Sequence, residues 1–573
     1  MAQENSAENG WPSGGGSRNR APARGRARLL TPISGFAAGL LLAATTVAGC
    51  GSSHNSTFGS QQLIIEPPKT DGGTIGTIGT ATLPDGAVVL GGGGIPIQCD
   101  AGSGKQCEVQ DCPGGGTTKI TGRVLDPAGK NPLWNVTVFV KDPALPLPDL
   151  ASSGLACGCG ALYPADVLGY GMTDATGHFE IDAAPYGANI SLVVQIGKWR
   201  KEIDGYTVAH CGTTVVPDLT LPASTAEGNL PDIAISTGQS DSLECLPLRI
   251  GVAATEYVAG AGGAGHIHIF HGYAGANTAM PAADSVDALW DSTADLEKHD
   301  VVLLSCEGQE TTGGGGRGAA AGGMGGGAPM TNAFQQSLLD YASAGGRVFA
   351  SHYHYAWFRQ PAGAANAVAF AAANVATWQG MNGANEAIDD TMSFAEDVDT
   401  TLAGGGAFPE GTVLSAWLGN VGALTNGTLP VQYARINVVT LNNAVEWIHL
   451  DPSVTAASVA ANSGTNFVAN AAQYFSVDTP IGGKTTCGRV VYSDLHVSGG
   501  AGKAVGAYAA DYAGGVGMRG GGGGMVVPGG CAMHDLSPQE KALEFMLFDL
   551  SSCLVTIGNS TPAQPPVVSP IPK

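Results

Sequence analysis

Two patterns of apolar and polar residues follow one another along this chain of 573 residues. From Lys119 to about residue 203, apolar and polar residues alternate in short runs, and turns that contain Asp and Gly separate the runs. A period of two is typical of half-buried β-strands, so residues 116–240 are predicted to form an all-β sandwich. The residues that the alternation assigns to its core include Ile120, Val124, Val136, Val138 and Val140.

The second pattern begins near Leu248, where short Val-rich runs alternate with segments of helical periodicity. This alternation predicts an α/β domain over residues 246–555. The runs predicted as strands are residues 248–258, 266–270, 300–308, 347–357 and 488–498. Helices are predicted at residues 332–344 and 538–550. Ser537, Pro538 and Glu540 provide the second helix with an N-cap, an N1 proline and a capping box.

An insertion of residues 360–480 interrupts the α/β pattern, and we expect it to pack beside the sheet as a subdomain. Within it, residues 411–421 have helical periodicity. Residues 435–441 and 444–450 are predicted to form a hairpin that turns at Asn442-Asn443. Two Gly-rich runs, residues 312–329 and 499–530, follow predicted strands and are expected to be long loops at the carboxyl edge of the sheet.

The N-terminus has the features of an export signal. Five arginines precede an apolar run of residues 33–47, which ends in Val47-Ala48-Gly49-Cys50. This order predicts a signal peptide over residues 1–49. The last four residues resemble the bacterial lipobox, which implies that Cys50 is the lipidated first residue of the mature chain. We therefore expect a protein anchored by lipid in the bacterial cell envelope, at the outer membrane, with disordered segments at residues 50–115 and 556–573.

Composition restricts the partners and predicts disulfides. Acidic residues number 48 against 26 Lys and Arg, so the net charge of −22 argues against nucleic acid as a partner. Of the 12 cysteines, those of the exported chain are expected mostly to form disulfides. Cys157 is expected to bond to Cys211 or another partner. Cys306 is expected to bond to Cys487 or Cys245, although it could instead remain a reactive thiol. A less favoured alternative is a zinc site made of Cys99, Cys107 and Cys112.

The sandwich region resembles the carboxypeptidase regulatory-like domain. Gly122-Arg123-Val124, residues 135–138 and residues 173–179 carry this resemblance. It implies a prealbumin-like sandwich among the carbohydrate-binding-like folds. Such domains serve mostly as extracytoplasmic spacers or adhesive modules, which implies carbohydrate or an envelope polymer as a partner.

The α/β region resembles the class I glutamine amidotransferase-like superfamily and, within it, the trehalose-utilisation-like proteins. Residues 300–308, 347–354 and 488–498 carry the resemblance, which implies a flavodoxin-like domain. The nucleophile position of the amidotransferases falls on His352, their triad histidine on His496 and their glutamate on Ser498. The nucleophile and the glutamate are therefore missing. Trehalose-utilisation-like proteins also have a histidine at the first position, whereas Cys306 falls where the family places oxyanion-hole backbone.

Histidines spaced two residues apart suggest a site at the strand ends. His352 and His354 would share one face of a strand, as would Asp494 with His496 and His266 with His268, because side chains alternate across a strand. If these ends converge, they offer ligands for zinc or another divalent ion. The alternative is that the imidazoles only hydrogen-bond loops. The predicted catalytic residues are His352, His496 and Asp494. The predicted metal ligands are His352, His354 and His496. The predicted binding residues are His354, Cys306, Glu307, Tyr353 and Trp357.

Three functions are compatible with these features. The preferred one is a lipid-anchored binding or scaffold protein for carbohydrate or an envelope polymer, with a catalytically degenerate amidotransferase-like domain. The alternative is a histidine- or metal-dependent hydrolase that acts on a sugar derivative. A purely structural envelope protein would leave the histidines unexplained.

Overall fold

The computed structural model describes most of residues 112–554, together with residues 81–82, 88–89 and 557. The gaps are residues 144, 151–154, 156, 159, 165, 239, 273–283, 308–329, 362, 380–392, 457–466 and 498–530. The predicted signal peptide, Cys50, both Gly-rich runs and nearly all of the tail therefore lie outside the described residues. Two short strands, β1 (Ala81–Thr82) and β2 (Val88–Val89), lie in the segment predicted to be disordered. The chain divides into residues 1–81 and a compact unit of residues 82–573, which is described below.

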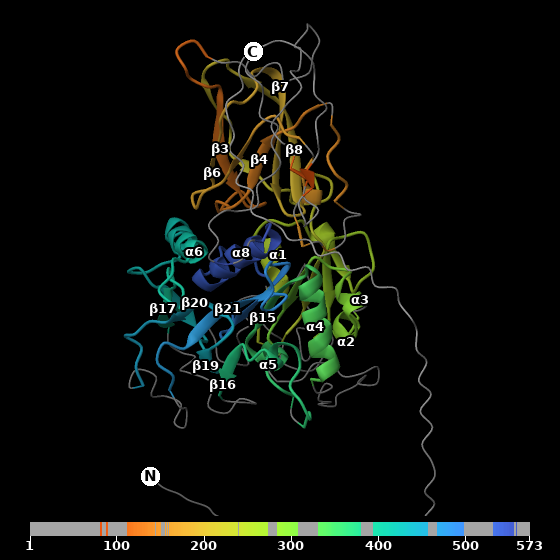
Figure 1. The fold of residues 1–573 in the computed structure, drawn as a ribbon, viewed down its shortest axis with the longest axis vertical. Coiled ribbons are helices and arrows are strands. Elements are labelled where there is room, and N and C mark those ends of the chain that lie inside the picture. The colour runs from red at the N-terminus through yellow and green to blue at the C-terminus, as the bar shows by residue number, and fades with distance from the viewer. Residues whose placement is uncertain are drawn as a thin grey trace, which may run out of the picture. The chain divides into compact units, whose positions relative to one another are not determined.

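Two four-stranded sheets form the predicted sandwich (orange and yellow in Figure 1). The first contains β3 (Lys119–Leu125), β6 (His178–Ile181), β9 (Thr213–Val215) and β10 (Leu219–Thr220). The second has the order β5-β4-β7-β8, made of Tyr170–Met172, Thr137–Val140, Gly187–Ile196 and Trp199–Val208. The valines and isoleucine that the alternation assigned to the core are all buried, which confirms that prediction.

A ten-stranded sheet contains the second pattern, in the order β12-β13-β11-β14-β15-β22-β21-β20-β17-β18. The strands from β12 to β22 are parallel, and the remaining four continue the sheet antiparallel. The parallel strands are β12 (Tyr257–Ala259), β13 (Ile267–Phe270), β11 (Ile233–Ser236), β14 (Val301–Leu304), β15 (Arg347–Ser351) and β22 (Gly488–Ser493). The antiparallel strands are β21 (Ala472–Thr479), β20 (Val445–Leu450), β17 (Ser393–Val398) and β18 (Leu429–Gln432).

Helices cover both faces of the parallel strands, which explains why these strands are almost entirely buried. On one face, α4 (Asn332–Ala344) packs with Leu338 and Tyr341 against Val302 and Val348. On the other face, α8 (Pro538–Ser551) shares a core with Ile235. Figure 1 shows α4 and α8 on either side of β15. Both predicted helices are present, and the capping box of Ser537 and Glu540 is confirmed.

Shorter helices complete this part of the chain. They are α1 (Leu246–Arg249), α2 (Asp287–Trp290), α3 (Thr293–Leu296), α5 (Ala369–Ala372) and α6 (Pro409–Asn420). The 3-10 helices are η2 (Gly160–Leu162), η3 (Leu243–Cys245), η4 (Ala254–Glu256) and η5 (His352–Trp357). The predicted strand at residues 248–258 is therefore wrong. Helical turns occupy most of it, and β12 begins only at Tyr257.

The boundary between the two patterns lies earlier than predicted. β11 (Ile233–Ser236) fell within the predicted sandwich, yet it pairs with β13 and β14 at the centre of the parallel strands. Helix α8 also packs against the sandwich, since the ring of Trp134 stacks on Phe545 at 5.6 Å and Trp199 lies 5.8 Å from Phe548. The sandwich thus contributes side chains to the core on the face of the ten-stranded sheet that α8 covers.

The insertion does not form a separate subdomain beside the sheet, because its strands β17, β18, β20 and β21 extend the sheet itself. The predicted hairpin is also wrong. β19 (Val438–Leu441) pairs with β16 (Ala376–Trp378), whereas β20 pairs with β17 and β21. The turn at Asn442-Asn443 therefore leads from one sheet into another.

Disulfides join distant parts of the chain, in agreement with the expectation for an exported protein. The described bonds are Cys112–Cys211, Cys157–Cys487 and Cys245–Cys531. They contradict the expected bond of Cys306 to Cys487 or Cys245. They also remove Cys112 from the alternative zinc site, whose other two cysteines lie outside the described residues. Cys306 is a buried thiol.

Candidate functional site

Three neighbouring parallel strands bring a thiol and two imidazoles together at their carboxyl ends. Cys306 follows β14, His352 follows β15 directly, and His496 follows β22. β15 pairs with both β14 and β22, so the three ends lie side by side. Ligands of sheets with parallel strands gather at this edge. The sequence predicted the two histidines here and named Cys306 as a binding residue, although it favoured a disulfide for the Cys306 thiol.

The three side chains are in mutual contact. The Sγ of Cys306 lies 3.5 Å from Nδ1 of His352 and 3.4 Å from Nε2 of His496. The two nitrogens are 3.0 Å apart. Cys306 and His352 are fully buried and His496 is 7% exposed. We call these three residues the Cys-His-His centre.

Outer hydrogen bonds fix which nitrogen of His352 faces the centre. Asn437 donates from Nδ2 to the carbonyl oxygen of Gln379 at 3.1 Å, which leaves its Oδ1 as an acceptor. That oxygen lies 3.2 Å from Nε2 of His352, so Nε2 carries the proton and donates. The lone pair of Nδ1 consequently points towards Cys306 and His496. Histidines that bind metals are usually oriented by such a second hydrogen bond.

Both imidazoles of the centre are held in the neutral form. Burial is the main reason why the pKa of His352 and the pKa of His496 lie well below the usual value, and the nearby charge of Arg435 lowers both further. A neutral imidazole has a lone pair to offer to a metal or a proton.

Three buried carboxyl groups lie next to residues of the centre, either along the chain or through a hydrogen bond. Asp494 accepts hydrogen bonds at Oδ2 from the backbone N–H groups of residues 437 and 438, at 2.7 and 3.1 Å. Asp241 is hydrogen-bonded to Ser351, which precedes His352. Glu307 follows Cys306 directly. All three carboxyl side chains are at most 1% exposed.

Two residues beside the centre have unusual backbone conformations. His352 has a φ of 32° and Tyr433 has a φ of 58°, and side chains other than glycine rarely adopt such positive values. The Tyr433 ring stacks on the ring of His496 at 6.2 Å. Strained residues of this kind cluster at functional sites.

One segment of the insertion forms a wall of the centre, and the sequence reasoning missed it. Tyr433, Arg435 and Asn437 alternate along this segment, and the first and third contact His496 and His352 respectively. The spacing of two residues was visible in the sequence. Nothing there indicated that this segment lies beside residues 494–496.

Most of the other predicted site residues have structural roles. β15 ends at Ser351 and η5 begins, so His354 does not share a face with His352 as expected. Nε2 of His354 donates to the carbonyl oxygen of Ser305 at 2.8 Å, and Nδ1 accepts from Nε1 of Trp357 at 3.1 Å. With both nitrogens used, His354 cannot be a ligand, which corrects its assignment as one. Tyr353 packs on the ring of His352 at 4.3 Å.

His266 and His268 do not join the centre. His266 Nδ1 and His268 Nε2 lie 2.9 and 3.3 Å from Oδ1 of Asp232, the residue that precedes β11. They therefore occupy the opposite, amino edge of the sheet. The predicted convergence of strand ends is correct for His352 and His496 and wrong for this pair.

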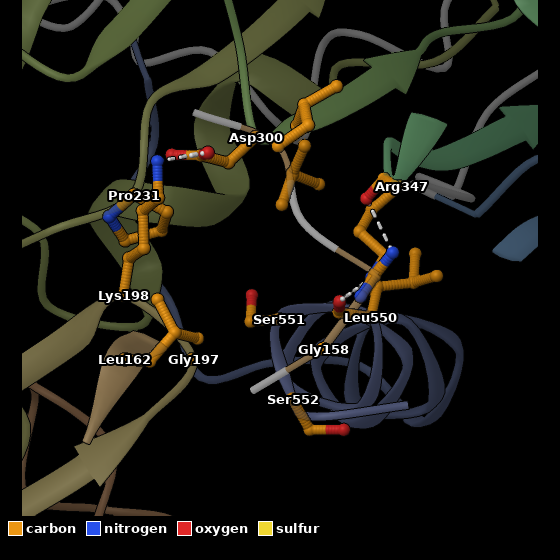
Figure 2. A pocket seen from close by; sticks show the side chains of 13 residues that line it. Gly158, Leu162, Gly197, Lys198, Pro231, Asp300, Arg347, Leu550, Ser551 and Ser552 are labelled. Atoms are coloured by element: carbon orange, nitrogen blue, oxygen red, sulfur yellow. Dashed lines mark hydrogen bonds and ion pairs between the residues drawn. The ribbon is translucent and has the colours of Figure 1, made fainter. Parts of the chain in front are cut away.

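A cavity of about 60 Å³ also lies at the amino edge (Figure 2). Lys198 and Asp300, 2.6 Å apart, form an ion pair in its wall. Arg347 donates to the carbonyl oxygens of Gly345, Cys487 and Leu550, including a bond from Nε to Leu550 at 3.0 Å. Figure 2 shows Arg347 reaching the end of α8, where Leu550 and Ser551 lie. Arg347 thus satisfies the carbonyl group of Leu550 in the last turn of α8.

Comparisons with known proteins identify no family. No family profile matches the chain, and no curated protein does. A 9R-lipoxygenase from Cyanothece PCC8801 matches with 23% identity and a TM-score of 0.11, over 18% of this chain and 16% of the lipoxygenase. A cohesin–X-dockerin complex from Acetivibrio cellulolyticus matches with 13% identity and a TM-score of 0.14, over 23% and 84%.

A β-galactosidase from Rahnella sp. R3 matches with 12% identity and a TM-score of 0.20, over 47% of this chain and 29% of the enzyme. These similarities are too low to carry an argument about fold or function. Among the described residues, no helix is both long enough and apolar enough to cross a membrane. The case for function therefore depends on the geometry of the centre.

Proposed function

We propose that this protein is a metal-dependent hydrolase whose metal ligands are Cys306, His352 and His496, with zinc as the ion that fits best. The observation that carries the proposal is the spacing of the three ligand atoms. Bond lengths of about 2.3 Å to sulfur and about 2.05 Å to nitrogen would place tetrahedral ligands about 3.6 Å (S to N) and about 3.3 Å (N to N) apart. The corresponding distances here are 3.4, 3.5 and 3.0 Å.

The number of ligands favours a catalytic site over a structural one. Structural zinc sites have four protein ligands, whereas catalytic sites have three and leave a position for water or substrate. When bound, the ion would supply a water of lowered pKa for hydrolysis. The chain provides neutral imidazoles for this set, a hydrogen bond from His352 to Asn437 that orients the ring, and buried carboxyl groups that favour a cation.

The strand order supports the finer description of the fold. Beyond the short edge strand β12, the parallel strands run β13-β11-β14-β15-β22, and these five taken in chain order give 2-1-3-4-5, the flavodoxin-like order. We propose that this sheet is an amidotransferase-like domain in which His352 occupies the nucleophile position. The positive φ of His352 is consistent with the sharp turn of a nucleophile elbow. Cys306 then provides sulfur from the neighbouring strand end, so the chemistry is not that of an amidotransferase.

The rest of the chain would position this centre in the cell envelope. We propose that Cys50 carries the lipid anchor at the outer membrane and that the sandwich is a carboxypeptidase regulatory-like module that binds carbohydrate or an envelope polymer. Incorporation of labelled palmitate into the wild-type protein and its absence from a Cys50→Ala variant would test the anchor. Glycan-array binding by the full chain would test the partner.

Metal analysis of the purified full-length protein tests the centre. We expect about one zinc ion per chain, and loss of most of it in the His352→Ala and Cys306→Ser variants. His354→Gln is the matched control, because His354 is also a buried histidine but both of its nitrogens are engaged elsewhere. A folded wild-type protein that binds no zinc, cobalt or copper ion would refute the proposal. Turnover of an ester or glycoside panel that chelation abolishes would support the hydrolase assignment, whereas metal binding without turnover would favour a binding protein.

A second candidate function is hydrolysis by a cysteine nucleophile. The series Cys306, His352 and Asn437 is favoured by the two contacts that connect its members, at 3.5 and 3.2 Å. Activity that persists in chelator and disappears on alkylation of Cys306 would favour this candidate.

A further inference from the structure

A second group of metal-binding side chains lies on the antiparallel end of the ten-stranded sheet. Asp397 of β17 pairs with His449 of β20. Nδ1 of His449 lies 3.1 Å from Oδ2 of Asp399, and Nε2 lies 4.0 Å from Oδ2 of Asp397. Ligand atoms of Asp399, Glu446 and His449, one from each, all lie within 4.8 Å of one another. We call these three residues the Asp-Glu-His cluster.

An irregularity in β20 places Glu446 and His449 on the same face of the sheet. In a regular strand, residues three apart lie on opposite faces. Here the register between β20 and β21 shifts on both sides of Ile448. Glu446 consequently pairs with Phe475 and His449 with Ala472, which belong to one core, whereas Ile448 belongs to the core on the other face. Such bulges redirect side chains and are frequent beside functional sites.

The carboxylates of this group lack a matching positive charge. Within the described part of the chain, Asp397 and Asp399 form their ion pairs with His449, and no lysine or arginine pairs with either of them or with Glu446. Burial, together with the charge of Asp399, raises the pKa of Glu446 to about 7. A single imidazolium cannot balance three carboxylates, so a bound cation would relieve their repulsion.

The spacing and the ligand types fit a divalent ion. Two ligands about 2.1 Å from an ion are about 3.0 Å apart in octahedral geometry and about 3.4 Å apart in tetrahedral geometry. The 3.1 Å between His449 and Asp399 lies in this range, so an ion can replace the proton that joins them. Carboxylates suit Mn²⁺ and imidazole suits Zn²⁺, whereas a site for Ca²⁺ or Mg²⁺ would consist of oxygen ligands. The side chains of His449 and Asp399 are 18% and 17% exposed, which leaves an ion access from solvent.

We infer that Asp399, Glu446 and His449 form a second metal site, which binds a divalent transition-metal ion, Mn²⁺ or Zn²⁺. The site is distinct from the Cys-His-His centre, because its ligands come from β20 and from the residue that follows β17. The bound ion would connect these two strands of the insertion. Water would occupy its remaining positions, since the cluster is partly exposed.

The test is titration of the full-length protein with Mn²⁺, followed by the electron paramagnetic resonance signal of the free ion. The wild type should bind about one Mn²⁺ per chain. Each of the variants Asp399→Asn, Glu446→Gln and His449→Gln should bind at least about tenfold more weakly, because even the loss of an outer partner of a metal ligand costs that much. As an independent measurement, Mn²⁺ should raise the urea midpoint of the wild type but not of these variants. Zn²⁺ is tested in the same way by chelator competition.

Two further variants complete the experiment. His266→Gln is the matched control, because His266 is also a partly exposed histidine in contact with a carboxylate, 2.9 Å from Asp232, and it should bind Mn²⁺ like the wild type. Cys306→Ser removes a ligand of the other centre and should leave Mn²⁺ binding unchanged, while circular dichroism establishes that each variant is folded.

The second site is refuted if the wild type binds neither Mn²⁺ nor Zn²⁺ outside the Cys-His-His centre. It is also refuted if the three cluster variants bind as tightly as the wild type, or if only Cys306→Ser loses the ion. Failure of the Cys-His-His centre to bind metal would leave this inference standing, because the cluster variants are compared with the wild type at their own site.

Discussion

The pH dependence of metal binding should show how few protons the centre releases. In most sites containing histidine, the metal competes with protons on the imidazoles, so affinity falls steeply below pH 6.5. Here the pKa of His352 and the pKa of His496 lie well below their usual value, mainly because both rings are buried. Both nitrogens are thus available at weakly acidic pH. We expect that at most one proton, from the sulfur of Cys306, is released per metal ion.

The size of the effect follows from this count. Each proton released changes the affinity tenfold per pH unit, or about 1.4 kcal/mol. Between pH 7.5 and pH 5.5 the affinity should therefore fall by at most about 100-fold, the share of a single thiol. Two imidazoles with an ordinary pKa of about 6.5 would each add about tenfold at pH 5.5, for a total near 10⁴-fold.

Competition with a chromophoric chelator at several pH values measures these affinities. Calorimetry in buffers of different ionisation enthalpy counts the protons independently. The Cys306→Ser variant should bind more weakly and lose most of the remaining pH dependence. A slope of two or three protons per metal between pH 5.5 and 6.5 would refute the reasoning, because it would mean that the imidazoles are protonated in the metal-free protein.

Three further changes test other parts of the structure. Asn437→Ala should lower metal affinity by about tenfold to hundredfold, measured by chelator competition, whereas Asn437→Asp should keep it, because an acceptor for Nε2 of His352 remains. His299 is buried with no hydrogen-bond partner at either nitrogen, and burial lowers its pKa to about 3. The unfolded chain therefore gains protons first as the pH falls below 6.5. Between pH 7 and pH 5, the wild type should lose about 2 kcal/mol of unfolding free energy that a His299→Phe variant retains, measured by urea titration. Replacing Cys157 and Cys487 by Ser should lower stability by about 2–5 kcal/mol; an unchanged urea midpoint would show that this bond does not constrain the unfolded chain.

Local patterns were enough to predict much of the secondary structure. Alternation located the sandwich strands, and the capping residues located the start of α8. These features depend on neighbours in the chain, so the sequence encodes them directly. Predictions failed where pairing was needed. The hairpin around Asn442-Asn443 had the right strands, yet each of them found a different partner.

The sequence by itself determined that His352 and His496 end two buried strands. Only the tertiary structure decided which groups meet them. Sheet order brought the end of β14, and with it Cys306, beside β15, and it placed His266 at the opposite edge. Because the chain turns into η5 after Ser351, His354 does not face the centre. Asn437, which belongs to the insertion, hydrogen-bonds to His352. The physical reason is that local alternation determines on which face of a strand a side chain lies. Which other side chains it meets there depends on the pairing of strands that are distant in the chain.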